Sequence, residues 1–388
     1  MIDREIEKEI LTLRREFPIL AILGPRQSGK TTLSKKVFPN YDYVSLEDID
    51  NREFAQNDPR GFLSRFSTNI VFDEIQRVPQ LISYLQTHAD QQNENGRIVI
   101  TGSHNFLLME QISQSLAGRV GIVTLLPFTA SELNPYGRSL NELLYSGMYP
   151  RIHDQQIRPE VFYKNYISTY IEKDVRQIKR ITDLDAFMNF IRILAGRTGQ
   201  VLNLSAISED CGISHNTVKE WISVLEASFI IFRVQPYHKN FNKRLVKNPK
   251  IYFYDTGLVC NLLGIRKQAE IDYHFLKGSI FETFILSEVV KYNYNYGKKL
   301  QLYYWRDNHQ KELDLIIDFG ANHYAIEIKS SQTIQEKYFE GLKYWMKISG
   351  AEPAALFLVY AGQEAFARNR MNVVGWNQIR EKIIFPAL

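Results

Sequence analysis

Short apolar runs separated by more polar stretches mark the first third of the chain. The runs "ILAIL" (19–23), "NIVFD" (69–73) and "RIVITG" (97–102) are too short for helices and rich in branched apolar residues. Runs of this length and composition are typical of buried strands. Because a helix-like stretch follows the first run, the pattern predicts an α/β fold in this part of the chain.

A different period follows in the middle of the chain. Over 147–194, apolar and aromatic residues recur every three or four positions, which predicts helices. A short helix at about 205–211, a break at Gly212-Ile213 and a second helix at about 214–227 come next. Since the β-rich "FIIFRVQPY" follows them, we expect a winged helix-turn-helix.

A hairpin is predicted in the last part of the chain, where two alternating runs flank Gly320-Ala321. Glycine followed by another residue is the signature of a tight type II′ turn. That turn would pair Asp318 with His323, Ile316 with Ala325, and Asp314 with Glu327. Lys329 lies two positions beyond Glu327, on the same face of the strand. A helix, a strand, this hairpin, a helix and a strand in that order predict a small α/β domain.

Length and composition fit a multidomain globular protein. The chain has 388 residues, 45% of them hydrophobic, which predicts roughly two to three domains with sizeable cores. We place the boundaries at 1–150, 151–245 and 246–388. The net charge of +4 is compatible with a nucleic-acid partner without requiring one.

Several classes of protein are disfavoured. Cys211 and Cys260 are the only cysteines and lie far apart, which argues against a disulfide framework and a cysteine zinc site. The charged N-terminus does not look like a signal peptide, and no apolar run approaches the roughly 18 residues of a membrane helix. We therefore expect a cytoplasmic protein without a membrane partner.

The most specific motif is "GPRQSGKTT", which follows the first predicted strand and opens a helix. It fits the phosphate-loop pattern G-x-x-x-x-G-K-[ST]. Glycines let backbone N–H groups turn toward phosphate oxygens, Lys30 would reach the β- and γ-phosphates, and Thr31 would bind Mg²⁺. The predicted ATP-binding residues are Gly24, Pro25, Arg26, Gln27, Ser28, Gly29, Lys30, Thr31 and Thr32.

Polar residues at the ends of the later strands complete this predicted site. Asp73 would hold the Mg²⁺ shell, and Glu74 would orient or deprotonate the attacking water. Ser103, with Asn105 behind it, would hold that water or sense the γ-phosphate. Arg119 is a candidate arginine finger, in the same chain or on a neighbouring copy in a homo-oligomer; the alternative is an ordinary surface arginine.

The predicted hairpin carries a second candidate site. Asp314 and Glu327 face each other as like charges, which destabilise a sheet unless a cation neutralises them. A divalent metal would do so, with Glu282 as a further ligand from the preceding helix and Lys329 as the cation that positions water. The alternative is a solvated strand face.

Two groups of residues are candidates for DNA contact. His215, Asn216 and Lys219 lie on the outward face of the second helix-turn-helix helix. An acid-free basic stretch then follows, with Lys239, Lys243, Arg244 and Lys247 interleaved with aromatic residues. Internal packing of the helix and a solvated linker are the alternatives.

The chain as a whole resembles prokaryotic P-loop ATPases of the AAA+ type that carry a winged helix and a C-terminal restriction-endonuclease-like domain. The resemblance is carried by "GPRQSGKTT", "IVFDEIQ", "SLAGRVGIVTLLPF", "ELDLII" and "AIEIKSS" among other stretches. It implies a parallel-sheet ATPase core, ATP and Mg²⁺ as ligands, and a nuclease-like fold at the end. Carried over by position are Lys30, Thr31, Asp73, Glu74, Arg119, Glu282, Asp314, Glu327 and Lys329. The Pro-Asp pair of some related nucleases is Leu313-Asp314 here.

Three hypotheses follow. The first is an ATP-hydrolysing, DNA-associated protein whose C-terminal domain is a Mg²⁺-dependent nuclease gated by nucleotide state. The second is an ATPase switch that binds DNA or protein without cleaving DNA. The third is a sensor ATPase whose basic stretch binds protein.

Overall fold

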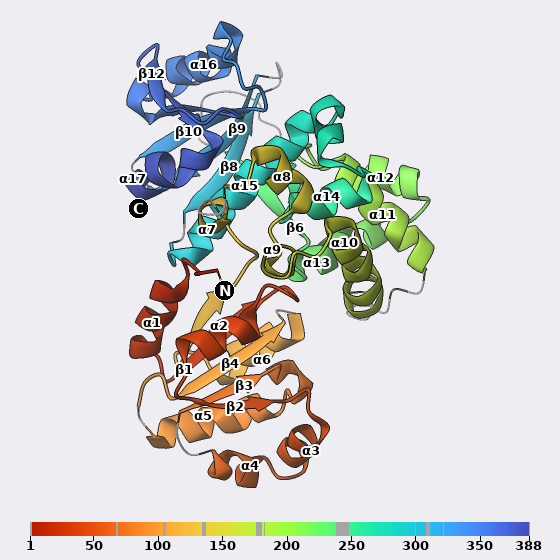
Figure 1. Cartoon of the computed structure of the whole chain (residues 1–388), viewed down its shortest axis with the longest axis vertical. Helices are drawn as coiled ribbons and strands as arrows, with labels where there is room; N and C mark the ends of the chain where they lie inside the picture. The colour runs from red at the N-terminus through yellow and green to blue at the C-terminus, as the bar shows by residue number, and fades with distance from the viewer. Residues whose placement is uncertain are drawn as a thin grey trace.

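The computed structural model describes residues 2–66, 69–92, 94–103, 106–133, 137–175, 181, 183–237, 248–298, 300–307, 311–320 and 322–387. Two sheets lie at opposite ends of the molecule, and a group of helices lies to one side between them (Figure 1). The N-terminus lies near the junction of the two halves, close to α2 and α7 in the same view. Among the described residues, no helix is both long and apolar enough to cross a bilayer.

The N-terminal sheet has five parallel strands in the order β2-β3-β4-β1-β5. Its strands are β1 (Ile19–Gly24), β2 (Asp42–Ser45), β3 (Ile70–Asp73), β4 (Ile98–Ser103) and β5 (Val120–Thr124). The α/β fold predicted for this region is confirmed. Because all five strands run in one direction, their carboxyl ends share one edge, where the predicted phosphate loop and the acidic pair both lie.

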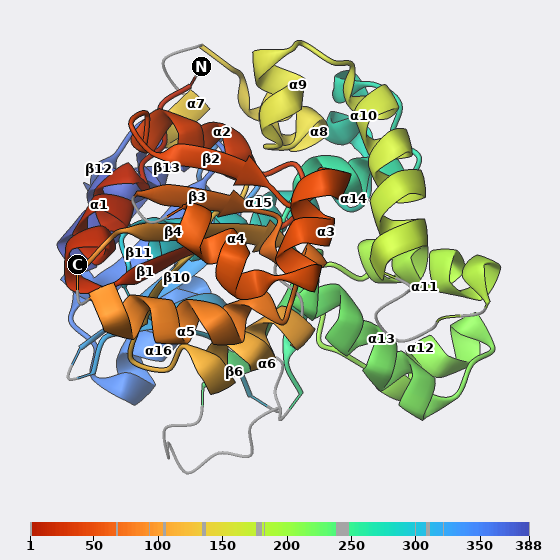
Figure 2. The ribbon, with the colours of Figure 1, turned by 90° about the horizontal axis from the view of Figure 1, so that it is seen from below.

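Helices cover both faces of this sheet (Figure 2). They are α1 (Glu7–Glu16), α2 (Lys30–Val37), α3 (Ile49–Asn57), α4 (Pro59–Arg65), α5 (Leu81–Gln92) and α6 (Phe106–Ser115). Leu20 and Ile22 of β1 pack with α1 and α2, whereas Ile19, Ala21 and Leu23 pack with α4, α5 and α6. This alternation follows from the two-residue period of a strand.

The middle of the chain is mainly helical, as its period predicts, but it is broken into short pieces. These are α7 (Ala130–Leu133), α8 (Leu140–Ser146), α9 (Pro150–Asp154), α10 (Pro159–Tyr166), the π-helical η3 (Ile167–Val175), α11 (Leu184–Gly196), α12 (Leu204–Cys211), α13 (His215–Ala227) and α14 (Thr256–Leu262). Pro150 and Pro159 each begin a helix. Proline is favoured at this first position because the N–H that it lacks would have no partner within the helix. Gly212, with φ of +65°, ends α12, and the Ser214 hydroxyl caps α13 by accepting from Thr217 N at 3.1 Å.

The second sheet has eight strands in the order β12-β13-β11-β10-β9-β8-β6-β7. They are β6 (Ile231–Pro236), β7 (Lys250–Phe253), β8 (Gln301–Arg306), β9 (Glu312–Asp318), β10 (His323–Lys329), β11 (Leu356–Tyr360), β12 (Phe366–Arg368) and β13 (Met371–Gly375). The β6–β7 hairpin that follows α13 joins this sheet because β6 pairs in parallel with β8. The boundary that we placed at 245/246 thus lies between two paired strands, within a segment (238–247) outside the described residues.

The register of the β9–β10 hairpin confirms two of the three predicted pairs, since Asp318 faces His323 and Ile316 faces Ala325. Gly320 adopts φ of +94°, and Phe319 N donates to Asn322 O at 3.2 Å to close the turn. The long helix α15 (Lys277–Asn295) packs on one face of the sheet, and α16 (Glu340–Ser349) packs on the other.

Candidate nucleotide site and C-terminal carboxylate cluster

The backbone of the phosphate loop needs its glycines. The loop runs from Gly24, the last residue of β1, to Lys30, the first residue of α2. Gly24 has φ of +153°, and a Cβ at this position would lie 2.2 Å from the Leu125 carbonyl oxygen. Gly29 is left-handed, with φ of +94°. The loop therefore folds tightly against the strand end and points the N-terminus of α2 toward the site.

The Lys30 side chain is 5% exposed and lies along its own loop. Its amine donates to Gly24 O at 3.2 Å and to Pro25 O at 2.8 Å. Burial lowers the pKa of Lys30, and the charges of Glu74 and Asp73 act in the opposite direction. The amine of Lys30 is thus held at the loop, near the carboxylates of Asp73 and Glu74.

Asp73 is the most firmly positioned acid of the site, at 4% exposure. Its Oδ2 accepts from the Thr31 hydroxyl at 2.8 Å and from the Tyr43 hydroxyl at 2.5 Å, and its Oδ1 accepts from the Thr101 hydroxyl. Burial, followed by the bond to Asp73, raises the pKa of Tyr43. The neighbouring Thr31 hydroxyl and Asp73 carboxylate are the hard oxygen donors that suit Mg²⁺.

Glu74 lies directly after β3 in a left-handed conformation, with φ of 59° and ψ of 48°. A non-glycine residue in this region stores strain, which is common at functional sites. Gln76 Nε2 donates both to Glu74 Oε2 and to Ser103 Oγ, the latter at 3.0 Å. Ser103 lies opposite Gly24 in the β1–β4 register. The structure therefore brings Glu74 and Ser103 together beside the phosphate loop, as predicted, and adds Gln76 between them.

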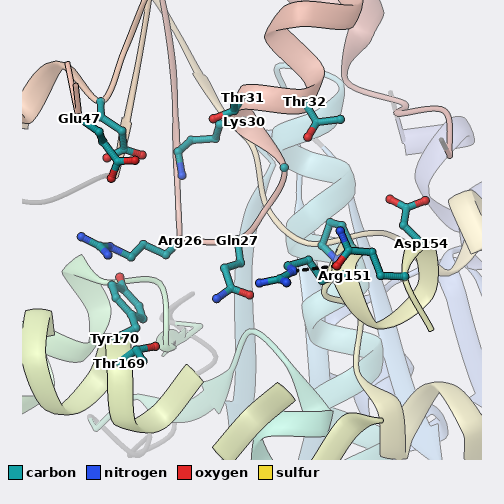
Figure 3. A pocket seen from close by; sticks show the side chains of 14 residues that line it. Arg26, Gln27, Lys30, Thr31, Thr32, Glu47, Arg151, Asp154, Thr169 and Tyr170 are labelled. Atoms are coloured by element: carbon teal, nitrogen blue, oxygen red, sulfur yellow. Dashed lines mark hydrogen bonds between the residues drawn. The ribbon is translucent and has the colours of Figure 1, made fainter. Parts of the chain in front are cut away.

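A pocket of about 400 Å³ opens over the phosphate loop (Figure 3). Its residues are Arg26, Gln27, Gly29, Lys30, Thr31, Thr32, Glu47, Glu74, Pro150, Arg151, Asp154, Gln155, Thr169 and Tyr170. Sequence reasoning missed the far wall, which comes from α9 and η3, because no motif marks those residues. Arg26 lies 5.9 Å from the ring centroid of Tyr170, whose hydroxyl donates to Ser228 O at 3.1 Å. The pocket thus lies between the five-stranded N-terminal sheet and the middle helices.

Arg119 lies away from this pocket. It precedes β5 at the amino end of the sheet, where its carbonyl accepts from Ile19 N at 3.1 Å. Its guanidinium pairs with Asp90 at 2.6 Å (Nε to Oδ1). The structure therefore does not bring Arg119 to the nucleotide pocket of its own chain, because the phosphate loop lies at the carboxyl end of the strands.

Arg4 is a site residue that sequence reasoning missed. Its guanidinium donates to Ser28 O of the phosphate loop at 3.1 Å and to Leu126 O at 2.7 Å. It also pairs with Glu132 Oε1 at 3.1 Å. Arg4 lies in a charged stretch that carries no recognisable motif, so only the folded chain reveals that it supports the loop.

The three hairpin residues of the second candidate site do come together. Lys329 Nζ forms an ion pair with Glu327 Oε1 and lies 3.9 Å from Asp314 Oδ2. Asp314 Oδ2 also accepts from Ile328 N at 2.7 Å. Burial, followed by the charge of Asp314, raises the pKa of Glu327 to about 8.

Glu282, the further ligand predicted from the preceding helix, lies at the same cluster, where its carboxylate is engaged by other side chains. Its Oε1 accepts from Lys250 Nζ at 3.0 Å and from the Tyr252 hydroxyl at 2.6 Å. Burial raises the pKa of Glu282 to about 7, against the charge of Lys250. Within the described ranges, no group of three or more Asp, Glu, His or Cys side chains is arranged to hold a metal ion. Sequence reasoning missed Lys250 in this role and counted it with the acid-free basic stretch considered for DNA contact.

The candidate DNA-contacting residues fall into two groups. His215, Asn216 and Lys219 are exposed on α13, while Val218 and Ile222 are buried on its other face, as the helical period predicts. The remaining candidates lie outside the described residues: Lys239, Lys243, Arg244 and Lys247. Asn105, predicted behind Ser103, also lies outside them.

Three family descriptions match most of the chain. Residues 16–134 match the AAA domain, which covers the whole β1–β5 sheet and its phosphate loop. Residues 137–269 and 277–379 match two domains of unknown function, DUF8612 and DUF4143. The first of these two matches includes both strands of the β6–β7 hairpin.

Relatives share most of this length. The uncharacterized protein Rv2008c of Mycobacterium tuberculosis is 30% identical over 322 residues, covering 81% of this chain and 71% of that protein. The uncharacterized protein MJ1544 of Methanocaldococcus jannaschii is 22% identical, covering 95% of this chain and 87% of that protein. Among solved structures, a Walker-type ATPase of Pyrococcus abyssi has a TM-score of 0.44 and 14% identity, covering 68% of this chain and 96% of that chain. RuvB of Thermotoga maritima has a TM-score of 0.31 and 19% identity, covering 60% and 90% respectively.

Proposed function

Because this chain belongs to the same protein family as the mycobacterial relative and contains an AAA domain with a complete phosphate loop, we propose that it binds MgATP and hydrolyses it. The observation that carries the proposal is the contact of the Thr31 hydroxyl with Asp73 Oδ2, at 2.8 Å, beside the buried amine of Lys30. Lys30 and Thr31 begin α2 and line the pocket, and Asp73 ends β3.

The residues divide the work of phosphoryl transfer among them. The loop N–H groups and Lys30 bind and orient the phosphates. Thr31 and Asp73 would hold Mg²⁺, which neutralises phosphate charge when bound. Glu74 orients the attacking water and accepts its proton, while Gln76 and Ser103 fix the position of the Glu74 carboxylate.

The decisive test is Glu74→Gln. We expect ATP to bind with nearly unchanged affinity while turnover falls by about 10²–10⁴-fold, because the proton acceptor is lost and the shape is kept. Lys30→Ala should lose binding itself, and Glu53→Gln, an exposed glutamate on α3, is the matched control. Normal turnover in Glu74→Gln would show that Glu74 is not the base.

A second candidate function is Mg²⁺-dependent DNA cleavage by the C-terminal domain. It is supported by the convergence of two buried carboxylates, Asp314 and Glu327, with the half-buried Lys329. Asp314 and Glu327 would hold the metal, and Lys329 would stabilise charge on the phosphate. The restriction-endonuclease-like assignment of this domain and the winged-helix assignment of α12, α13 and the β6–β7 hairpin are part of this proposal.

Cleavage is tested on linear, supercoiled and single-stranded DNA with Mg²⁺ or Mn²⁺, with and without ATP. Loss in both Asp314→Ala and Lys329→Ala, with Asp318→Asn on the same strand unaffected, is the expected result. An absence of cleavage by the wild type, with ATP turnover intact, would favour the ATPase switch. If the protein binds DNA, the logarithm of its binding constant should fall linearly with the logarithm of the salt concentration. The slope should be about 0.9 for each phosphate contact. A flat salt dependence would exclude DNA as the partner.

Arg119 is the reason that a homo-oligomer is part of the proposal. Since this residue lies at the end of the sheet opposite the phosphate loop, it could act only in the pocket of a neighbouring copy.

A further inference from the structure

A buried lysine stands at the centre of the C-terminal carboxylates. Lys250, the first residue of β7, is 2% exposed. Its amine lies 3.0 Å from Glu282 Oε1, forms an ion pair with Glu312 Oε1, and lies 4.0 Å from Asp314 Oδ1. Three carboxylates from α15 and β9 thus surround one amine, where a charge left unpaired would be costly. Without the lysine, these carboxylates would need another cation, such as a divalent metal ion, to neutralise them.

The oxygens of the cluster are unequally occupied. Glu282 Oε1 already accepts from both Lys250 and Tyr252. By contrast, Glu327 Oε2 is buried and accepts no hydrogen bond from any described residue. Space beside it is kept by Gly341, where a Cβ would lie 3.1 Å from that oxygen. The side of the cluster near Glu282 is therefore filled by Lys250. Glu327 pairs with Lys329 through Oε1 and retains a buried acceptor at Oε2.

We propose that Lys250 is the resident cation of this cluster, taking the place of one divalent metal ion, so that a single divalent cation binds, between Asp314 and Glu327. Glu282 is then the partner of Lys250 and positions it rather than binding metal. The divalent part of this inference rests on the proposed nuclease site. It specifies one-metal chemistry, in which a lone cation and Lys329 together face the phosphate, instead of a pair of metal ions.

Manganese titration of the nucleotide-free full chain tests the number of sites. With Asp314→Asn as the reference for binding elsewhere, the wild type should bind one Mn²⁺ that this variant loses. Glu282→Gln should keep that ion within about threefold in affinity, because Glu282 is not a ligand. Lys250→Met should bind Mn²⁺ about tenfold more tightly or bind a second ion, because a positive charge has been removed from among the carboxylates. Loss of the ion in Glu282→Gln would overturn the inference.

Thermal unfolding tests the role of Lys250 without any metal. Lys250→Met should lower Tm by about 5 °C or more, since it leaves buried carboxylates unpaired. Adding Glu282→Gln should recover part of that loss, and Mn²⁺ should raise the Tm of Lys250→Met more than that of the wild type. Lys250→Arg is the matched control, because it changes the shape of the side chain and keeps the positive charge.

The outcomes separate this inference from the nuclease proposal. Equal Mn²⁺ affinity and stoichiometry in wild type and Lys250→Met would overturn the role of Lys250 while leaving the nuclease site intact. A Lys250→Met loss of Tm that Glu282→Gln does not reduce would do the same. An absence of specific Mn²⁺ in every variant would overturn the single divalent site together with the nuclease proposal.

Discussion

The buried contacts of Arg4 allow a prediction to be worked out in full. Arg4→Met removes a guanidinium whose side chain is 6% exposed and whose partner, the Glu132 carboxylate, is 1% exposed. The change deletes the ion pair at 3.1 Å and the bonds to Ser28 O at 3.1 Å and Leu126 O at 2.7 Å. Methionine keeps much of the apolar length of the arginine stem, so the main loss is polar.

The size of the loss follows from what Glu132 retains. Removing one partner of a buried ion pair costs about 3–5 kcal/mol, because the other charge stays buried. Glu132 still accepts from Glu5 N at 2.7 Å and from Thr129 N at 2.8 Å, which partly satisfies that charge. We therefore expect Arg4→Met to lower the free energy of unfolding by about 2–4 kcal/mol. Adding Glu132→Gln should recover about 1 kcal/mol or more, since the stranded charge disappears.

Urea unfolding and ATP kinetics measure the two consequences. The unfolding midpoint should fall in Arg4→Met and rise again in the double variant, while Arg15→Met, on the exposed side of α1, should match the wild type. The KM for ATP should rise, because Ser28 in the phosphate loop loses its support. A variant that unfolds and binds ATP like the wild type would refute the assignment of Arg4 as a positioning residue.

Two further predictions concern Asp73, at the candidate nucleotide site, and the buried histidine His153. Thr101→Val removes the hydroxyl that donates to Asp73 Oδ1, so it should lower stability by about 1–3 kcal/mol and raise the Mg²⁺ concentration needed for half-maximal turnover; unchanged urea and Mg²⁺ titrations would contradict this. Burial lowers the pKa of His153, which lies in α9 with Nε2 2.8 Å from Gly147 O, below its ordinary 6.5. Between that lowered pKa and 6.5 the unfolded chain binds more protons, so wild-type stability should fall as pH drops below 6.5, and His153→Gln should flatten that part of the urea-midpoint profile. Parallel profiles for the two proteins would show that His153 does not titrate in this way.

The predictions that succeeded rest on local rules. The phosphate loop is fixed by glycine conformations and a lysine within a few residues, and the hairpin register is fixed by the turn at Gly320. The caps of α12 and α13 follow from Gly212 and Ser214 for the same reason. Each of these features depends only on residues that are close in sequence, so one amino-acid sequence is enough to predict it.

The features that were missed depend on contacts between distant segments. Tyr43 reaches Asp73 because β2 lies beside β3, and no pattern around Tyr43 marks that meeting. In the sequence Lys250 is one more basic residue of the acid-free stretch, and only the fold brings it, on β7, against α15 and β9. Arg119 shows the converse, since its local context suggested an arginine finger and the strand direction places it at the end of the sheet opposite the phosphate loop of its own chain.

Consecutive residues near the N-terminus connect the phosphate loop to the C-terminal part of the chain. Arg4 contacts the phosphate loop at Ser28 O, and Glu5 pairs with Arg380, near the C-terminal end, at 3.1 Å. Ala130 N of α7 donates to Glu288 Oε2 at 2.6 Å, and Glu288 lies on α15.

The same helix, α15, carries Glu282, six residues from Glu288 and so less than two helical turns away. Swinging the C-terminal sheet away from the ATPase domain would strip Glu288, which is 1% exposed, of its backbone donor. Separation would also expose the Glu288 carboxylate, which pairs with Lys291, to water. The junction is therefore held by polar contacts of largely buried residues, and these contacts would have to break if the two sheets moved apart.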